Sequence, residues 1–357
     1  MQHRALFLIA AAGLFPAVVY GYPLDGFEET GIKRLEAYRL RTEGVLEGRK
    51  QPTGARLPTA MVDLRLTNRN DLGITAADPE LTLQLENLLG DEIDDYGIAV
   101  LDISDPDNPR YAVVNGDYRQ NVGSVGKMVA ALGLFQALAD AWPRESDRVR
   151  VLRETVVTAD IFSQKDTHGV TFYDVEDQSV EHRIIREGDQ ASLWEYLDWM
   201  LSPSSNAAAG MIMREAMLIR HFGKAYPVAE EEIRRFFDET PSSELTALYA
   251  ATFDAALERH GFDLGQIRQG SIFTRGGKNT VRGTGTSYAT ANTLLRLGLL
   301  MEKGQLVDEF SSRQLKRLLY VTERRIRYAS SPALNLSLIH ISEPTRLLRR
   351  SRMPSSA

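Results

Sequence analysis

A long apolar segment that begins after Lys127 constrains the fold of this chain more than any other feature. It predicts a helix buried in a sizeable core, with one face made by Met128, Leu132, Phe135 and Leu138. Ser124 lies directly ahead of this helix, three residues before Lys127. Residues three apart on a helix share a face, so the lysine amine is expected within reach of the serine hydroxyl.

This Ser-x-x-Lys spacing suits a nucleophile and its base in acyl transfer. A serine hydroxyl becomes nucleophilic when a neighbouring base takes its proton, and a lysine can do so once burial and nearby positive charge lower its pKa. The helix dipole would also favour the developing anion. The alternative is that Ser124 only caps the helix, a common role for a serine at that position.

A second motif, Ser204-Ser205-Asn206, is predicted in a turn between the helical stretch 193–200 and a following Ala- and Met-rich helix. In such a turn Ser204 could relay a proton to a leaving group, and the Asn206 amide could orient a substrate. Helix capping is again the alternative, because Ser and Asn are common at helix ends.

Together the two motifs resemble those of the penicillin-recognising serine hydrolases, the family of class A β-lactamases and D-Ala-D-Ala peptidases. The predicted strands 96–103 and 111–115 before the first motif, and the Thr-rich start and helix over 285–307, are similar to that family as well. The resemblance covers about residues 81–335. It implies an α/β (α+β) fold with an antiparallel sheet flanked by helices and an all-helical subdomain.

The resemblance implies an acyl-enzyme mechanism on β-lactam or D-Ala-D-Ala-type amide bonds. Ser124 would be the nucleophile, Lys127 its base and Ser204 the proton relay, while Asn206 would orient the substrate. Ser205 and Glu244 are expected to face the substrate. The family's deacylating glutamate precedes a Leu-Asn pair, which follows neither Glu244 nor Glu239 here, so deacylation is expected to be slow. The alternative is a catalytically inactive relative that binds cell-wall peptide or a partner protein.

The family's third motif, Lys-Ser/Thr-Gly on a strand, is expected after 325–335 and does not occur there. Residues 336–357 match the translation of a transposase-type sequencing adapter, so we expect a gene cut short, without its last strands and closing helix. In that family the missing segment supplies an oxyanion-hole N–H, and one such donor is worth about 3 kcal/mol of transition-state stabilisation. A chain without it is therefore expected to be catalytically impaired. Segments 278–280 and 282–285 have the right residue types, but they precede the last helix and are predicted to form a surface loop.

The remaining sequence suggests four further segments. Residues 1–21 read as a signal peptide whose apolar core is too short to span a bilayer comfortably, with an uncleaved anchor as the alternative. Residues 22–75 read as a polar extension, either an amphipathic arm or a propeptide-like segment. The hydrolase domain would occupy 76–335, with an inserted hairpin at the rim of the cleft over 163–190. That hairpin contains His168 and His182, which are predicted to be solvated rather than metal ligands. Asp78 as a cap and Pro79 at the first helical position predict a helix start near the beginning of the hydrolase domain.

Composition favours an exported, periplasmic or secreted monomer. The chain has no cysteine, which excludes disulfides and thiolate metal sites. Its formal net charge is −6, and residues 22–335 carry −10 once the +3 of the tail and the charge of Arg4 are set aside. An acidic chain without a basic patch disfavours nucleic acid as a partner and leaves small β-lactams or cell-wall peptides. No metal or organic cofactor is implied.

Overall fold

The computed structural model describes residues 25–48, 50 and 61–323. The predicted signal peptide, the strand region expected after 325 and the adapter-like tail lie outside the described residues. Within them the protein is mostly helical and carries small antiparallel two-stranded sheets, which gives it mixed α+β character.

The helices and strands follow one another in chain order, with 3-10 helices written η. They are α1 (Gly26–Thr30), α2 (Lys33–Glu43), α3 (Pro79–Leu89), η3 (Gly90–Asp95), β1 (Ile98–Asp102), β2 (Arg110–Val114), η4 (Gly123–Gly126), α4 (Lys127–Ala141), α5 (Glu145–Glu154), β3 (Val156–Thr158), η5 (Ile161–Ser163), β4 (Val170–Tyr173), β5 (Val180–Arg183), β6 (Gln190–Ser192), α6 (Leu193–Leu201), α7 (Asn206–Phe222), η6 (Gly223–Ala225), α8 (Glu230–Glu239), α9 (Ser242–Arg259), β7 (Ile267–Arg268), α10 (Arg275–Thr280), β8 (Tyr288–Ala289), α11 (Ala291–Glu302) and α12 (Glu309–Tyr320).

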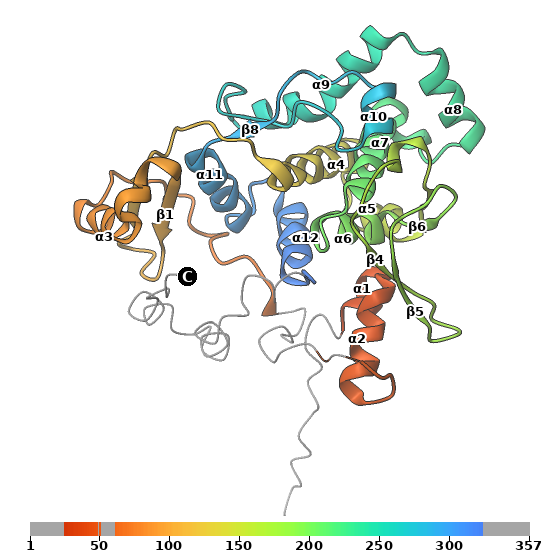
Figure 1. The fold of residues 1–357 in the computed structure, drawn as a ribbon, viewed down its shortest axis with the longest axis horizontal. Helices are drawn as coiled ribbons and strands as arrows, with labels where there is room; N and C mark the ends of the chain where they lie inside the picture. The colour runs from red at the N-terminus through yellow and green to blue at the C-terminus, as the bar shows by residue number, and fades with distance from the viewer. Residues whose placement is uncertain (1–24, 49, 51–60, 324–357) are drawn as a thin grey trace, which may run out of the picture.

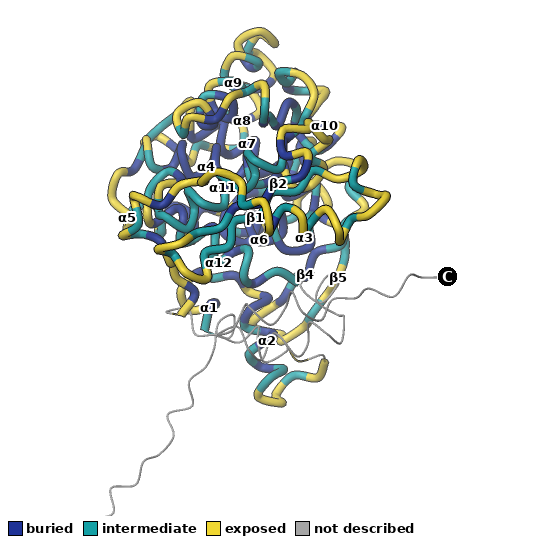
Figure 2. Tube along the Cα trace, turned by 90° about the vertical axis from the view of Figure 1, so that its left-hand side faces the viewer, coloured by how far each residue is buried: buried dark blue, intermediate teal, exposed yellow. Residues whose placement is uncertain are grey.

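The core forms around α4, as its apolar sequence predicts. Every residue of α4 from Val129 to Leu138 is buried, and the helix packs against α6, α7 and α9. Figure 2 shows the same segments in the buried interior, with exposed residues on the outer helices and loops. Each fully buried Leu or Phe contributes about 2 kcal/mol to stability, so this packing holds α4 firmly in the core.

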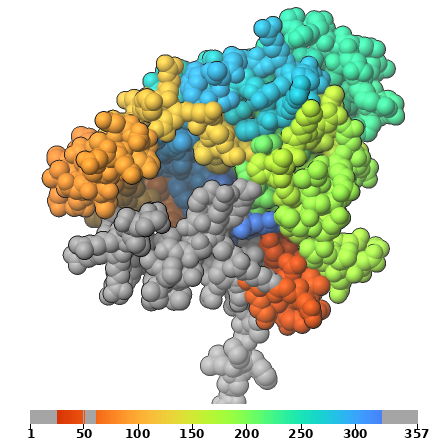
Figure 3. All heavy atoms as spheres, viewed as in Figure 1, coloured from red at the N-terminus to blue at the C-terminus, as the bar shows by residue number. Residues whose placement is uncertain are grey.

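The strands form four separate pairs in the described part of the chain. The pairs are β1–β2, with Ile98 opposite Val114, β3–β6, β4–β5 and β7–β8. The β1–β2 pair lies between α3, which packs on β2, and α11, which packs on β1. It lies with α3 on one side of the molecule, away from α8 and α9 (Figures 1 and 3). Within the described residues, the predicted antiparallel sheet is represented by this flanked pair.

Several sequence predictions are confirmed at the level of elements. Asp78 caps α3 by accepting from the Leu81 amide, with Pro79 in the first turn. The helix predicted within 285–307 is α11, whose start has a capping box of Thr290 and Thr293. A hairpin, β4–β5, lies within the segment 163–190, and its strand β4 packs against α2.

The predicted surface loop at 278–280 was wrong. Those residues end the short helix α10, which begins because the Thr274 side chain accepts from the Gly277 amide. Gly276 lets this helix lie directly on the Ile161 carbonyl, where an added Cβ would be 1.9 Å from the oxygen. A close approach of this kind needs glycine for its size and is not visible in a composition pattern.

The polar N-terminal segment contributes to the core. Ile32 and Leu35, at the start of α2, are buried, and so is Arg34 between them. Arg34 forms a bidentate ion pair with the buried Asp198 on α6, with Nε–Oδ2 and Nη2–Oδ1 both 2.5 Å. Its Nη2 also donates to Ser202 Oγ at 3.2 Å, in the turn that follows α6. The pair thereby ties α2 to the segment that carries the second motif.

Candidate active site

Two hydrogen bonds to β8 position the segment that leads to Ser124. The backbone N–H and carbonyl of Gln120 pair with the carbonyl and N–H of Ala289, both at 3.0 Å. The chain then forms η4 and passes directly into α4 (Figure 1). Ser124 in this 3-10 turn is exposed, while Lys127, the first residue of α4, is 1% exposed. The turn therefore presents a hydroxyl at the surface above a buried amine.

The amine of Lys127 brings the two motifs together. Its Nζ lies 3.1 Å from Ser124 Oγ, 3.1 Å from Ser204 Oγ, 3.0 Å from the Ser204 carbonyl and 2.8 Å from Asn206 Oδ1. The Phe273 ring covers it, with the ring centroid 4.8 Å away. Residues almost 80 positions apart thus share one hydrogen-bonded centre, as the sequence predicts for Ser124, Lys127, Ser204 and Asn206.

The hydrogen-bond partners of Lys127 allow it to exchange a proton. The Ser204 carbonyl and Asn206 Oδ1 only accept, so each takes one N–H of the amine. The hydroxyls of Ser124 and Ser204 both donate and accept, so they suit either an ammonium group or a neutral amine. A neutral amine could accept the Ser124 proton along the 3.1 Å contact and hold its place through the two carbonyl oxygens.

Ser204 has an unusual backbone conformation. Its φ is +66°, in the left-handed region that non-glycine residues seldom adopt, and it is only half-buried. Such conformations cost of order 1–3 kcal/mol and cluster at functional sites. Here the conformation allows both the carbonyl and the hydroxyl of Ser204 to meet the same amine.

Ser205 has a role different from the expected one. It is fully buried, caps α7 by accepting from the Ala208 amide at 3.1 Å, and donates to Asp166 Oδ2 at 2.7 Å. Its hydroxyl therefore faces the protein interior in this structure. Asn206, the first residue of α7, is half-buried beside it and joins the centre.

Glu244 lies in the first turn of α9 and is exposed. Glu244 follows the junction between α8, which ends at Glu239, and α9. The hydrogen bonds that join Ser124, Lys127, Ser204 and Asn206 do not involve Glu244. The structure thus brings together the four predicted catalytic residues and leaves Glu244 outside their hydrogen-bond network.

Asp166 is the neighbour that sequence reasoning missed. Its side chain is 2% exposed and accepts from the Ala207 amide at 2.9 Å, while His168 Nδ1 lies 2.6 Å from its other oxygen. Burial raises the pKa of Asp166, but the hydrogen bonds from Ala207, His168 and Ser205 outweigh burial and lower it to about 2. His168 is therefore paired with a carboxylate instead of being simply solvated. The acid lies 38 residues before Ser204 in sequence, and no spacing indicates its role.

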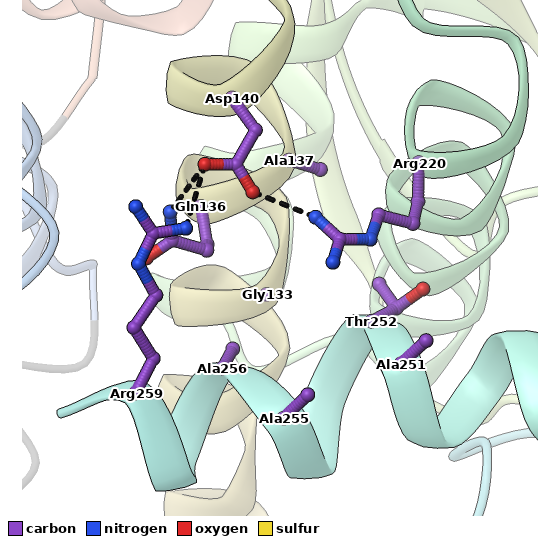
Figure 4. A pocket seen from close by; sticks show the side chains of 10 residues that line it. All are labelled: Gly133, Gln136, Ala137, Asp140, Arg220, Ala251, Thr252, Ala255, Ala256 and Arg259. Carbon is purple, nitrogen blue, oxygen red and sulfur yellow. Dashed lines mark hydrogen bonds and ion pairs between the residues drawn. The ribbon is translucent and has the colours of Figure 1, made fainter. Parts of the chain in front are cut away.

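A small cavity, partly open to solvent, lies between α4, α7 and α9 (Figure 4). It is lined mainly by alanines and by Gly133, and Asp140 pairs there with Arg220 and Arg259. Asp140 is 13 residues beyond Lys127 along α4, or roughly 20 Å at the rise of an α-helix. We interpret this cavity as a packing gap between helices closed by ion pairs.

In the described residues no group of three or more His, Cys, Asp or Glu side chains is arranged to hold a metal ion. None of the helices within those residues is long and apolar enough to cross a membrane. A scan against protein-family models and a search of curated proteins found no match to this chain. The geometry of the Lys127 centre therefore carries the functional argument.

Proposed function

We propose that this protein is a serine hydrolase of the penicillin-recognising type, with a fold related to β-lactamases and D-Ala-D-Ala peptidases. The single observation that supports it is the position of Lys127 Nζ, within 3.1 Å of the hydroxyls of Ser124 and Ser204 and 2.8 Å from Asn206 Oδ1. A helix cap alone would not require a buried lysine shared by two distant motifs.

The proposed reaction begins with acylation. Ser124 Oγ attacks the carbonyl of a β-lactam or D-Ala-D-Ala-type amide, and its proton moves to Lys127 Nζ. The proton then passes through the Ser204 hydroxyl to the leaving nitrogen as the C–N bond breaks, which gives an ester on Ser124. Water completes the cycle by hydrolysing that ester. Asn206 is partly exposed at the start of α7, and its Oδ1 accepts from Lys127. Its amide NH₂ group is suited to donate a hydrogen bond to the acyl side chain of the substrate.

Deacylation distinguishes two forms of the proposal. Glu244 is exposed on α9 and takes no part in the hydrogen bonds of the centre, which favours a long-lived acyl-enzyme. The same observation supports the second candidate, an inactive relative that uses the site to bind cell-wall peptide or a partner. The same proposal includes that the protein is exported and monomeric, and that it acts on small molecules or cell-wall peptides without a cofactor.

The test is covalent labelling of the full chain by a fluorescent penicillin, followed by intact-mass spectrometry. We expect one adduct of the mass of the penicillin, and its loss in Ser124→Ala. Ser243→Ala, at an exposed serine in the first turn of α9, is the matched control and should label normally. Labelling that survives Ser124→Ala would refute the assignment, whereas peptide binding without any adduct would favour the binding protein.

A further inference from the structure

The carboxylate of Asp166 lies behind the turn that carries Ser204 and Asn206. Its Oδ2 accepts from Ser205 Oγ at 2.7 Å and from the Ala207 amide at 2.9 Å, so it is hydrogen-bonded to the residues on both sides of Asn206. Its Oδ1 accepts from the amides of Thr167 at 2.8 Å and His168 at 3.1 Å and faces His168 Nδ1 at 2.6 Å. Both oxygens of a side chain that is 2% exposed are thus fully used.

The turn needs an external support of this kind. Ser204 has a φ of +66°, a strained conformation that persists only where the surroundings hold it. Ser205 contributes a backbone bond from its amide to the Trp199 carbonyl at 3.0 Å and the cap to Ala208. Asp166 adds the two bonds from outside the turn, and its negative charge also lies at the N-terminus of α7, where the helix dipole favours an anion.

We propose that Asp166 is a positioning residue for the acylation centre, supplied by the segment inserted between η5 and β4. It would act through the turn, because Ser204 and Asn206 in turn hold Lys127, and Lys127 meets Ser124. This inference rests on the proposed function for its effect on catalysis. The placement of the turn by Asp166 is a separate claim about structure.

The substitution Asp166→Asn isolates this role because it preserves size. An asparagine offers one accepting oxygen, and its NH₂ group must then face either Ser205 and Ala207 or the donors of Thr167 and His168. One side of the present arrangement is therefore lost. A charge-assisted pair of hydrogen bonds becomes a neutral one or a repulsive contact, and the turn should drift from Lys127.

Two readouts on the full chain test the proposal. The first is the limiting rate and the half-saturating concentration for acylation by the fluorescent penicillin. Asp166→Asn should lower the limiting rate tenfold or more and change the half-saturating concentration much less. The second is hydrogen exchange of the peptide that contains 204–208, which should be faster in the variant. Asp177→Asn, the same substitution at an exposed position in the β4–β5 turn, should leave both unchanged.

The outcomes separate the two claims. Because the chain is expected to acylate slowly, the proposed function is refuted by a wild-type chain that forms no adduct even on prolonged exposure to excess penicillin, and hydrogen exchange alone then decides the role of Asp166. Unchanged exchange and unchanged acylation in Asp166→Asn would overturn the positioning role. If Asp166→Asn fails to fold, Ser205→Ala removes one of the two bonds, together with the cap on Ala208, and keeps the carboxylate. It should slow acylation several-fold, and a wild-type rate would overturn the inference.

Discussion

Replacing Arg34 by methionine should be among the most destabilising single changes in this protein. Arg34 is 1% exposed and its bidentate partner Asp198 is fully buried. Removing one member of a buried ion pair leaves an uncompensated charge, which costs about 3–5 kcal/mol. The Val321 carbonyl also loses its 2.9 Å bond from Arg34, which adds about 1 kcal/mol. Ser202 Oγ keeps a donor, since it accepts from the Glu323 amide.

The double variant Arg34→Met/Asp198→Leu tests that this cost comes from the stranded charge. With the charges of Arg34 and Asp198 removed and similar volumes retained, a large part of the loss should be recovered, because apolar replacement of a buried pair is often neutral or stabilising. Glu323, which lies 3.4 Å from Arg34 Nε and is 15% exposed, still loses its cation in this variant and keeps part of the cost. Arg39→Met on the same helix is the matched control. Arg39 pairs with Glu36 and Glu43 on the surface of α2, and such pairs contribute about 0–1 kcal/mol.

Urea unfolding monitored by tryptophan fluorescence measures these differences directly. Trp194 and Trp199 are both buried on α6, the helix that carries Asp198. We expect Arg34→Met to lose about 4–6 kcal/mol of the free energy of unfolding, by the costs just given. The reasoning would be refuted by a loss below about 1 kcal/mol, or by a double variant no more stable than Arg34→Met.

Three further changes have defined outcomes. Gly210→Ala should destabilise by about 1–2 kcal/mol in thermal unfolding although alanine favours helices, because the new Cβ would lie 2.1 Å from the Phe162 carbonyl; a stabilised variant would contradict this. Both Ser204→Ala and Ser204→Gly should abolish acylation, yet the glycine variant should be about 1 kcal/mol more stable, as φ is +66°; equal stabilities would argue against strain. Because the pKa of Asp166 falls from 3.8 to about 2 on folding, its contribution of about 2 kcal/mol is present above pH 5 and lost as the pH falls towards 2. Denaturation from pH 5 to pH 2 should therefore show the difference between wild type and Asp166→Asn shrinking, and a constant difference would exclude this linkage.

Local patterns predicted the elements that depend on local physics. The cap and proline at Asp78 and Pro79 gave α3, and the apolar spacing after Lys127 gave the buried α4. The meeting of Ser124 with Ser204 and Asn206 did not follow from spacing. It was expected from the resemblance to a family, because nothing local in the sequence specifies which turn packs on which helix start.

The supports of the centre could not be predicted from sequence for a related reason. Arg34 reaches Asp198 from 164 residues away, and Asp166 reaches Ser205 from 39 residues away. Each is a charged residue in a polar stretch, where charge ordinarily indicates solvent exposure. Their burial depends on a partner that only the tertiary structure identifies. Glu244 is the opposite case: it was expected to face the substrate, and a helix starting at Ser242 places it on the surface, outside the hydrogen bonds of the centre.

The energetics of the centre argue against a purely architectural origin. A protein that needed only two helix starts would not bury Lys127 and hold Ser204 at a φ of +66°, because both features cost free energy that simple capping avoids. Part of this cost is offset within the centre, since the Lys127 amine bonds to Ser204 and Asp166 accepts from the turn. Such mutual dependence around an exposed serine supports the proposed acyl transfer, in which α2 and the segment between η5 and β4 would both hold the turn that carries Ser204 and Asn206.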